Sequence, residues 1–94
     1  MTGKKAFHAI IEGRVQGVNF RMATYHAADK LGVSGWVRNK PDGSVEAFFE
    51  GDADSVDEII KWCHKGPPMA SVKNVRLSED VYTGRYTDFT VRYT

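Results

Sequence analysis

Residues 13–21, GRVQGVNFR, place two glycines and an arginine where a predicted strand is followed by a predicted helix. Gly13 and Gly17 allow backbone conformations that are closed to other residues, so that successive N–H groups can converge on a ligand. The start of a helix adds unpaired N–H donors and the positive end of the helix dipole. Arg21 adds a planar, permanently charged guanidinium that matches two phosphate oxygens. This chemistry predicts a binding site for a phosphate group.

A glycine-rich turn before a helix is not specific by itself. The P-loop motif ends in Gly-Lys-Ser/Thr and the dinucleotide-binding motif reads GxGxxG, and neither pattern is present here. A second motif, GWVRNKPDGSVEAFFEG over residues 35–51, predicts a hairpin closed by Pro41, Asp42 and Gly43. The two motifs together are more specific than the glycine-rich turn alone.

With both motifs present, the sequence resembles the acylphosphatase family. The family pattern GxVQGVxFR matches at Gly13, Val15, Gln16, Gly17, Val18, Phe20 and Arg21. The pattern GxVxNxxDGxV matches at Gly35, Val37, Asn39, Asp42, Gly43 and Val45. The later Gly66-Pro67 and Ala70 are also similar to the family. The resemblance spans nearly the whole chain and implies one domain over residues 1–94.

The resemblance implies a role for each part of the site. Arg21 and a run of backbone N–H groups would hold the phosphoryl group of an acyl phosphate, a small-molecule substrate. These N–H groups belong to Val15, Gln16, Gly17, Val18, Asn19 and Phe20. The Asn39 carboxamide would position the attacking water, because its carbonyl accepts from water and its NH₂ donates to a second oxygen. The implied products are a carboxylate and inorganic phosphate, which would also act as an inhibitor.

The implied reaction needs no acid, base or nucleophile from the protein. The leaving carboxylate has a conjugate acid with a pKa of about 4, so it departs unprotonated at neutral pH. A loose transition state at phosphorus needs mainly charge neutralisation and a water held in line. We therefore expect no metal and no cofactor. Lys40 departs from some family members, which carry a small hydroxyl residue there, and this departure should affect the rate but not the reaction type.

Other reactive side chains have simpler interpretations. His8, His26 and His64 have no metal-ligand spacing among them, which favours structural or surface roles. Cys63 continues an apolar helical stripe, where a thiol behaves as a small, unreactive hydrophobe.

Three aromatic residues of the hairpin raise the possibility of a base-stacking sheet. They are Trp36, Phe48 and Phe49. The aromatic-and-basic RNP pattern of RNA-binding sheets is absent, so packing in the core or on the sheet is the better interpretation.

Composition limits the partners and the compartment. The 94 residues include 13 Lys plus Arg and 12 Asp plus Glu, a net charge of +1, which argues against nucleic acid or an anionic membrane as a partner. A single cysteine forms no internal disulfide, and no apolar run approaches the roughly 20 residues of a membrane span. We expect a cytoplasmic monomer.

Hydrophobic periodicity switches between strand and helix along the first half of the chain. Residues 5–13 predict a strand, and apolar residues then recur at helical spacing until Gly32, a typical helix C-cap. The helical positions are Phe20, Ala23, Ala27 and Leu31. Residues 34–40 and 44–50 are rich in Val, Trp and Phe and predict the two strands of the hairpin.

The second half of the chain predicts another helix and two more strands. The helix is marked by Val56, Ile59, Ile60 and Cys63, with Asp52 or Asp54 as its N-cap and Gly66-Pro67-Pro68 beyond its end. Residues 72–79 and 88–94 predict strands. The order β-α-β-β-α-β with an extra terminal strand indicates a ferredoxin-like fold. We expect an α+β sandwich with two helices on one face of an antiparallel sheet of four to five strands.

Two alternatives remain open at this point. A non-catalytic phosphate or anion-binding module on the same fold would need the glycine-rich turn and Arg21, but it has no use for a water-positioning amide at Asn39. A ferredoxin-like metal carrier would need paired thiolates, and the single cysteine argues against it.

Overall fold

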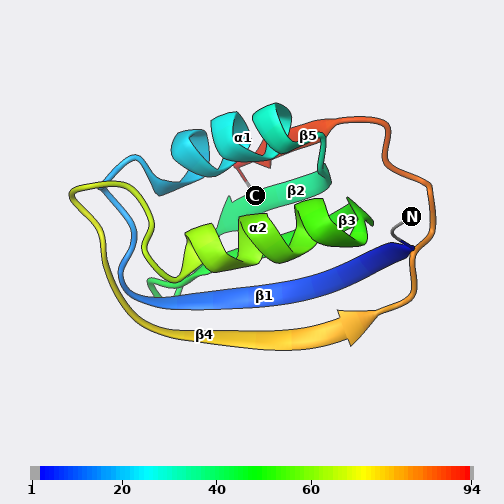
Figure 1. The fold of residues 1–94 in the computed structure, drawn as a ribbon. Coiled ribbons are helices and arrows are strands. Elements are labelled where there is room, and N and C mark those ends of the chain that lie inside the picture. Colours follow the sequence, from blue (N-terminus) through cyan, green and yellow to red (C-terminus); the bar gives the residue numbers. More distant parts are fainter. Residues whose placement is uncertain (1–2, 94) are drawn as a thin grey trace.

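Five strands and two helices alternate along the chain (Figure 1). The computed structural model describes residues 3–93. The elements are β1 (Lys4–Arg14), α1 (Phe20–Leu31), β2 (Ser34–Asn39), β3 (Val45–Asp52), α2 (Ala53–Cys63), β4 (Ser71–Asp80) and β5 (Phe89–Arg92). Residues 1, 2 and 94, which the predicted domain and its last predicted strand include, lie outside the described residues. The predicted order of elements is confirmed.

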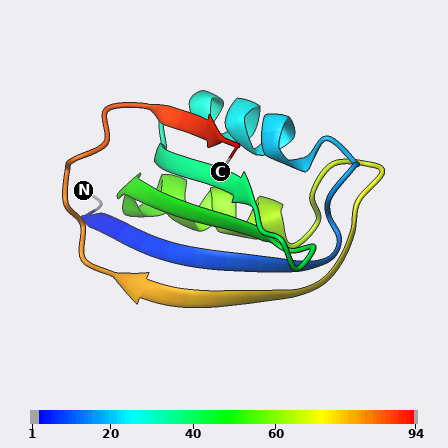
Figure 2. The same cartoon turned by 180° about the vertical axis from the view of Figure 1, so that it is seen from behind.

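The strands form one sheet in the order β4-β1-β3-β2-β5. The first four strands of this order pair antiparallel, as the ferredoxin-like fold predicts. At the remaining edge the sheet differs from the fully antiparallel arrangement, because β5 pairs parallel to β2. The chain leaves β4 at the end of the sheet where β2 begins, so β5 enters from that end and runs in the direction of β2 (Figure 2).

Both helices cover the same face of the sheet, as expected (Figures 1 and 2). α1 packs over β2 and β5, whereas α2 packs over β1 and β3. Strand β4 lies at the edge beyond the helices and is mostly exposed. Neither helix in the described part of the chain is long and apolar enough to cross a membrane.

Helix α1 ends as predicted but buries a different stripe. Gly32 adopts a left-handed conformation, with φ of 73°, and its N–H bonds the carbonyls of the last turn. The fully buried residues are Phe20, Thr24 and Ala28, while the predicted Ala23 is only half-buried. Burying the Thr24 hydroxyl costs little free energy, because its Oγ1 donates to the Phe20 carbonyl at 2.7 Å. A polar residue therefore occupies a core position that hydrophobic periodicity alone does not identify.

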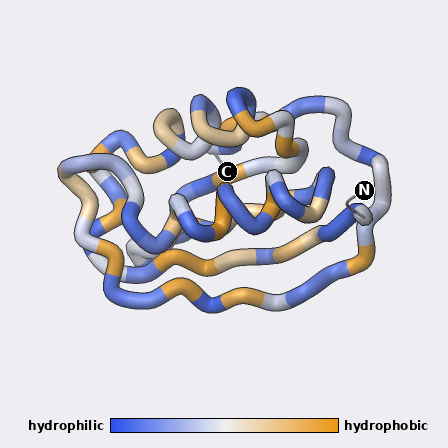
Figure 3. Tube along the Cα trace, viewed as in Figure 1, coloured by the Kyte–Doolittle hydropathy of each residue, from blue (hydrophilic) through white to orange (hydrophobic). Residues whose placement is uncertain are grey.

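Helix α2 follows its predicted stripe, with Val56, Ile59 and Cys63 fully buried. Asp52 is its N-cap residue, but the Asp52 side chain makes no capping hydrogen bond. Its carboxylate instead pairs with the Lys4 ammonium, at 2.6 Å. Figure 3 shows polar and apolar residues alternating along both helices, as expected for helices that lie on a sheet.

The core lies between the helices and the sheet. Alternate residues of the central strands β1 and β3, including Ile11 and Phe49, are fully buried there. The rings of Phe49 and Phe89 stack with their centroids 5.7 Å apart. This contact fixes β5 on the same core as the four ferredoxin-like strands.

The face of the sheet opposite the helices carries two hydrogen-bonded carboxylates. Burial alone would raise the pKa of Glu46, but hydrogen bonds from His8 and Arg38, both at 2.5 Å, outweigh it and lower this pKa below its usual 4.5. Glu50 is 1% exposed and accepts hydrogen bonds from the backbone N–H and the hydroxyl of Thr83, at 2.9 and 3.0 Å. The hydrogen bonds between Glu50 and Thr83 hold the segment between β4 and β5 against the sheet and so set where β5 begins.

Burial raises the pKa of the Cys63 thiol to about 12, which predicts a pH-dependent stability. An unfolded thiol loses its proton near the usual pKa of 9.0, whereas the folded thiol keeps it, so stability is fully present below that pH and falls as pH rises. We expect the free energy of unfolding to decrease by about 1 kcal/mol more in wild type than in Cys63→Ala between about pH 8 and pH 10. Urea titrations of both proteins measure this difference, and equal decreases would contradict it.

Candidate active site

The loop between β1 and α1 has an unusual backbone. The pairing of β1 with β4 shifts register between Glu12 and Gly13, where Gly13 has φ of 124°. A Cβ atom on Gly13 would lie 2.3 Å from the Ser71 carbonyl oxygen, so no larger residue fits. Farther along, Gly17 and Asn19 adopt left-handed conformations, with φ of 74° and 65°. Glycine and asparagine tolerate this region, and such alternation turns neighbouring N–H groups toward a common point.

These N–H groups have no acceptor in the protein. Within residues 3–93, no carbonyl, carboxylate or hydroxyl accepts a hydrogen bond from the backbone N–H of residues 16–20. The first turn of α1 continues directly from this loop, and it contains no acidic residue. Five consecutive donors at the positive end of a helix dipole are chemically suited to an anion.

Three buried apolar side chains anchor this loop in the core. Val15, Val18 and Phe20 are 1%, 8% and 2% exposed and belong to the core cluster. Their burial holds the backbone in place while its N–H groups remain available, so the loop is shaped before any ligand binds.

The Gln16 side chain joins the loop to the β2–β3 hairpin. Its Nε2 donates to the carbonyls of Lys40 and Ser44, at 2.7 and 2.9 Å. Those two residues form the mouth of the hairpin, because the Lys40 N–H itself donates to the Ser44 carbonyl at 2.9 Å. One carboxamide therefore fixes both arms of the hairpin to the loop, directly next to Asn39.

The hairpin turn is further stabilised by Asp42. Its carboxylate accepts from the hydroxyl and the N–H of Ser44, at 2.6 and 2.9 Å. The hydroxyl bond and the N–H bond lower the pKa of the Asp42 carboxyl below its usual 3.8. Gly43 completes the turn with φ of 96°, and its N–H donates to the Lys40 carbonyl at 3.2 Å.

Asn39 is the last residue of β2 and lies beside the end of β5. The parallel register pairs Arg38 with Arg92, which brings Asn39 and Tyr93 to neighbouring positions. The Asn39 carboxamide is half-buried and makes no hydrogen bond within the part of the chain that the structure describes. Its oxygen and its NH₂ remain available to a ligand or a water molecule.

Arg21 lies in the first turn of α1, and its guanidinium stacks on the Tyr93 ring with Cζ 4.7 Å from the centroid. No carboxylate in residues 3–93 forms an ion pair with Arg21. A cation in the first turn opposes the helix dipole, and here its charge is not neutralised by an acidic neighbour in those residues. Stacking orients the guanidinium without occupying its N–H donors.

These groups surround one pocket of about 120 Å³. It is lined by Val15, Gly17, Asn19, Phe20, Arg21, Met22, Asn39 and Tyr93. Six of the predicted site residues are therefore brought together. Gln16 and Val18 do not line the pocket, because the Gln16 side chain turns to the hairpin and the Val18 side chain to the core.

Met22 and Tyr93 line the pocket although the motifs do not include them. The alternation of Phe89, Val91 and Tyr93 along the last strand places all three on one face, and this signal was available in the sequence. It does not reveal that Tyr93 meets Arg21, because that contact depends on the parallel register of β5.

The three histidines lie away from this pocket. His8 contacts Glu46 on the opposite face of the sheet, His26 is exposed on α1, and His64 Nδ1 lies 3.0 Å from the Ile60 carbonyl oxygen. Nowhere in residues 3–93 do three His, Cys, Asp or Glu side chains form a cluster that could hold a metal ion. The pocket offers one permanent cation, a run of N–H donors and one amide. It is suited to bind a phosphoryl group and to orient a water molecule beside it.

Comparisons with known proteins agree with this geometry. The acylphosphatase family profile matches residues 7–91. The chain is 53% identical to an acylphosphatase of Rubrobacter xylanophilus over 88 residues, which cover 94% of this chain and 80% of that protein. It is 49% identical to an acylphosphatase of Syntrophobacter fumaroxidans over 90 residues, which cover 96% of this chain and 93% of that protein. The structure of an acylphosphatase from Coxiella burnetii superposes with a TM-score of 0.90 at 39% identity and covers 95% of this chain and 93% of that chain. With both motifs, the fold and these relatives in agreement, the chain belongs to the acylphosphatase family.

Proposed function

We propose that this pocket hydrolyses the carboxyl-phosphate bond of acyl phosphates, with Arg21 and the loop N–H groups binding the phosphoryl oxygens and Asn39 positioning water. The observation that supports this most directly is the arrangement of charges and donors around one small pocket. Gly17, Asn19 and Phe20, whose N–H groups have no acceptor in residues 3–93, line this pocket together with Arg21 and Asn39. The relatives named acylphosphatase support the same activity.

The chemistry of each step follows from these groups. The N–H donors and the Arg21 guanidinium neutralise the charge on the equatorial oxygens of the phosphoryl group as the bond to the carboxylate lengthens. The Asn39 carbonyl accepts from the attacking water and holds it in line with the leaving oxygen. The carboxylate leaves without a proton because its conjugate acid has a pKa of about 4, and the proton of the attacking water passes to a phosphoryl oxygen, so that the products are carboxylate and inorganic phosphate. No cofactor is required by this sequence of events.

The non-catalytic binding module is less well supported. A site that only binds phosphate needs the loop and Arg21. In such a site nothing would compensate for leaving the Asn39 carboxamide half-buried without a hydrogen-bond partner in residues 3–93. Two hydrogen bonds from Gln16 hold the mouth of the Asn39 hairpin against the loop. Such positioning is expected of a group that must contact a water molecule at a defined distance from phosphorus.

Three further properties belong to this proposal. The product is inorganic phosphate, which binds the same donors and inhibits competitively. The chain acts as a single domain and as a monomer. A cytoplasmic location fits its one, fully buried thiol.

Phosphate release from benzoyl phosphate, compared with a phosphate monoester, tests the function together with Arg21. We expect rapid release from the acyl phosphate and little from the monoester, whose leaving group needs a proton. Arg21→Lys should lower kcat/KM at least roughly a hundredfold, because an ammonium keeps the charge but loses the planar pair of donors. Arg21→Ala should be about as inactive, and near-normal phosphate inhibition constants in both variants would remove Arg21 from the site.

Asn39→Ala separates catalysis from binding. A group that contacts only the attacking water acts in the transition state, so kcat should fall at least roughly a hundredfold while the affinity for phosphate changes little. Single-turnover rates and calorimetric titration with phosphate measure the two quantities. Near-normal turnover in this variant would favour the binding module instead.

Gln16 is a positioning residue in this proposal, and a double-mutant cycle with Asn39 tests its role. Gln16→Met keeps the length of the side chain but removes both hydrogen bonds, so kcat should fall about tenfold with the phosphate inhibition constant nearly unchanged. In an Asn39→Ala background the same change should have almost no further effect on kcat, because the hairpin then carries no group to position.

Urea titrations establish whether Gln16→Met is folded under the assay conditions. The activities of the single and double variants then complete the test. If the two substitutions multiplied in their effects on kcat, Gln16 would act on the phosphoryl group by another route and the positioning role would be wrong.

A further inference from the structure

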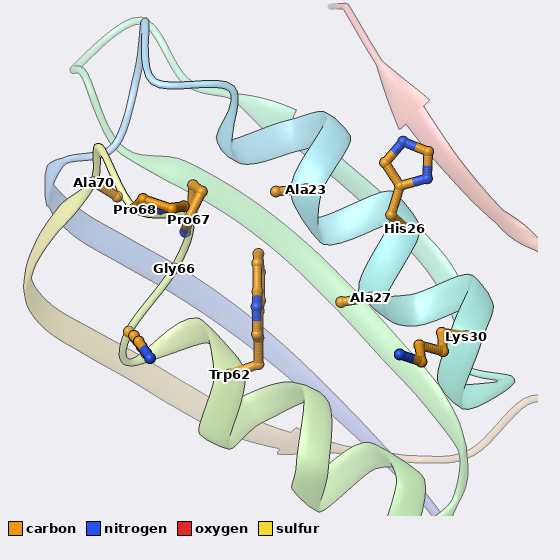
Figure 4. A pocket seen from close by; sticks show the side chains of 10 residues that line it. Ala23, His26, Ala27, Lys30, Trp62, Gly66, Pro67, Pro68 and Ala70 are labelled. Carbon is orange, nitrogen blue, oxygen red and sulfur yellow. The ribbon is translucent and has the colours of Figure 1, made fainter.

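A second and larger hollow lies between the two helices (Figure 4). It encloses about 870 Å³ and shares no lining residue with that pocket. Its apolar walls are Ala23, Ala27, Trp62, Pro67, Pro68 and Ala70. His26, Lys30 and Lys65 are its basic lining residues. We call this hollow the helix groove.

Trp62 forms the floor of the helix groove. One side of its ring packs on Phe20, with centroids 5.5 Å apart, and the residue remains half-buried. Figure 4 shows the ring standing between the helices, with small alanine side chains of α1 opposite it. Small neighbours around a large, partly exposed aromatic ring leave room for an apolar side chain to lie against it.

The charges around the helix groove are of one sign. None of its lining residues is Asp or Glu. Lys30 and Lys65 are exposed, and neither forms an ion pair with a carboxylate of residues 3–93. The other face of the sheet differs, because Glu46 there pairs with Arg38 and His8. The helix groove is thus complementary to a ligand that is apolar at its centre and negatively charged at its ends.

The two lysines lie at opposite ends of the helix groove. α1 and α2 run in opposite directions (Figure 1), and Lys30 belongs to the last turn of α1 whereas Lys65 follows the end of α2. The α1 side of the groove, from Ala23 to Lys30, spans about 10 Å at the helical rise of 1.5 Å per residue. Three or four extended residues cover about that length. A ligand with a single carboxylate would reach one lysine, whereas a short peptide reaches both.

We propose that the helix groove binds a peptide segment in which one or two large apolar residues, lying against Trp62, are flanked on both sides by Asp or Glu. The apolar side chains would cover the Trp62 ring, and the flanking carboxylates would pair with Lys30 and Lys65. The two sites share no lining residue, although Phe20, which lines the phosphate pocket, packs against Trp62.

The two tryptophans of the chain make a direct measurement possible. Trp36 lies on β2 and stacks with Arg92, away from the helix groove, so Trp36→Phe leaves Trp62 as the single fluorescent reporter. Acetyl-Glu-Asp-Leu-Phe-Asp-Glu-amide is the probe. Two control peptides replace either its acidic residues by lysine or its Leu-Phe by Ser-Ser. We expect a saturable change in Trp62 emission with the probe, and affinities at least about tenfold lower for both controls.

Charge reversal tests the two ends of the site. Lys30→Glu and Lys65→Glu should each weaken binding of the probe about three- to tenfold, and more at low salt than at high salt. Lys61→Glu is the matched control, because Lys61 is exposed on α2 but does not line the groove. It should bind the probe like the parent protein. All three variants should keep the wild-type kcat/KM for benzoyl phosphate, so failure of this proposal is distinct from failure of the proposed enzyme activity.

Three results of these titrations would overturn the proposal, and a fourth would come from chemical shifts. The first is the absence of a saturable change with the acidic peptide, and the second is equal binding of the acidic and the lysine peptides. The third is benzoate binding as tightly as the peptide, because a single carboxylate on one ring would then be sufficient. Amide chemical-shift changes locate the binding, and changes at Gly17 and Asn19 rather than at Ala23 and Ala70 would assign the peptide to the phosphate pocket instead.

Discussion

Two hydrogen bonds from the Gln16 carboxamide connect the two halves of the site. The loop at residues 15–19 precedes α1, and Asn39 ends β2; backbone pairing links them through β3, whose Val45 pairs with both Ile11 of β1 and Asn39. The Gln16 Nε2 reaches the carbonyls on both arms of the hairpin mouth, at 2.7 and 2.9 Å. Its two protons give each carbonyl a second hydrogen bond, because the Lys40 and Ser44 carbonyls also accept from the N–H groups of Gly43 and Lys40. In the proposed mechanism, this contact sets the distance between the donors that bind the phosphoryl oxygens and the amide that holds water.

The rest of the fold stabilises a loop that is unfavourable alone. The left-handed backbone at Asn19 and the cation in the first turn of α1 each cost free energy. The N–H groups of the loop, which have no acceptor in residues 3–93, form no hydrogen bond there that would compensate. Burial of Val15, Val18 and Phe20 offsets these costs by anchoring the loop in the core. A bound phosphoryl group would supply the missing acceptors and the missing negative charge. The loop is therefore shaped before binding, and the ligand completes its hydrogen bonds.

Much of this arrangement follows from the sequence because its signals are local. Glycine positions, the Pro-Asp-Gly turn and the hydrophobic periods identify the hairpin, both helices and the loop between β1 and α1. Contacts between distant residues are not encoded in this way. Glu50 accepts a hydrogen bond from Thr83, which is 33 residues away in the segment that leads to β5, and the parallel register of β5 places Tyr93 near Arg21. Thr24 was missed as a core residue because its internal hydrogen bond removes the cost of burying a hydroxyl.

The size and composition of the pocket suggest how substrates are selected. A volume of about 120 Å³ suits the phosphoryl end and leaves the acyl group at the rim, beside Tyr93 and Met22, which are 74% and 38% exposed. Contacts made at an exposed rim discriminate weakly between acyl groups. No carboxylate or histidine lines the pocket in the described residues, so no side chain there donates a proton to a leaving alkoxide. A phosphate monoester would fit the same donors, but its alkoxide leaving group would depart slowly without a proton. In the proposed mechanism, selectivity therefore arises mainly from the acidity of the leaving group, because the pocket binds the phosphoryl group of either substrate and assists only the reaction whose leaving group is a stable anion.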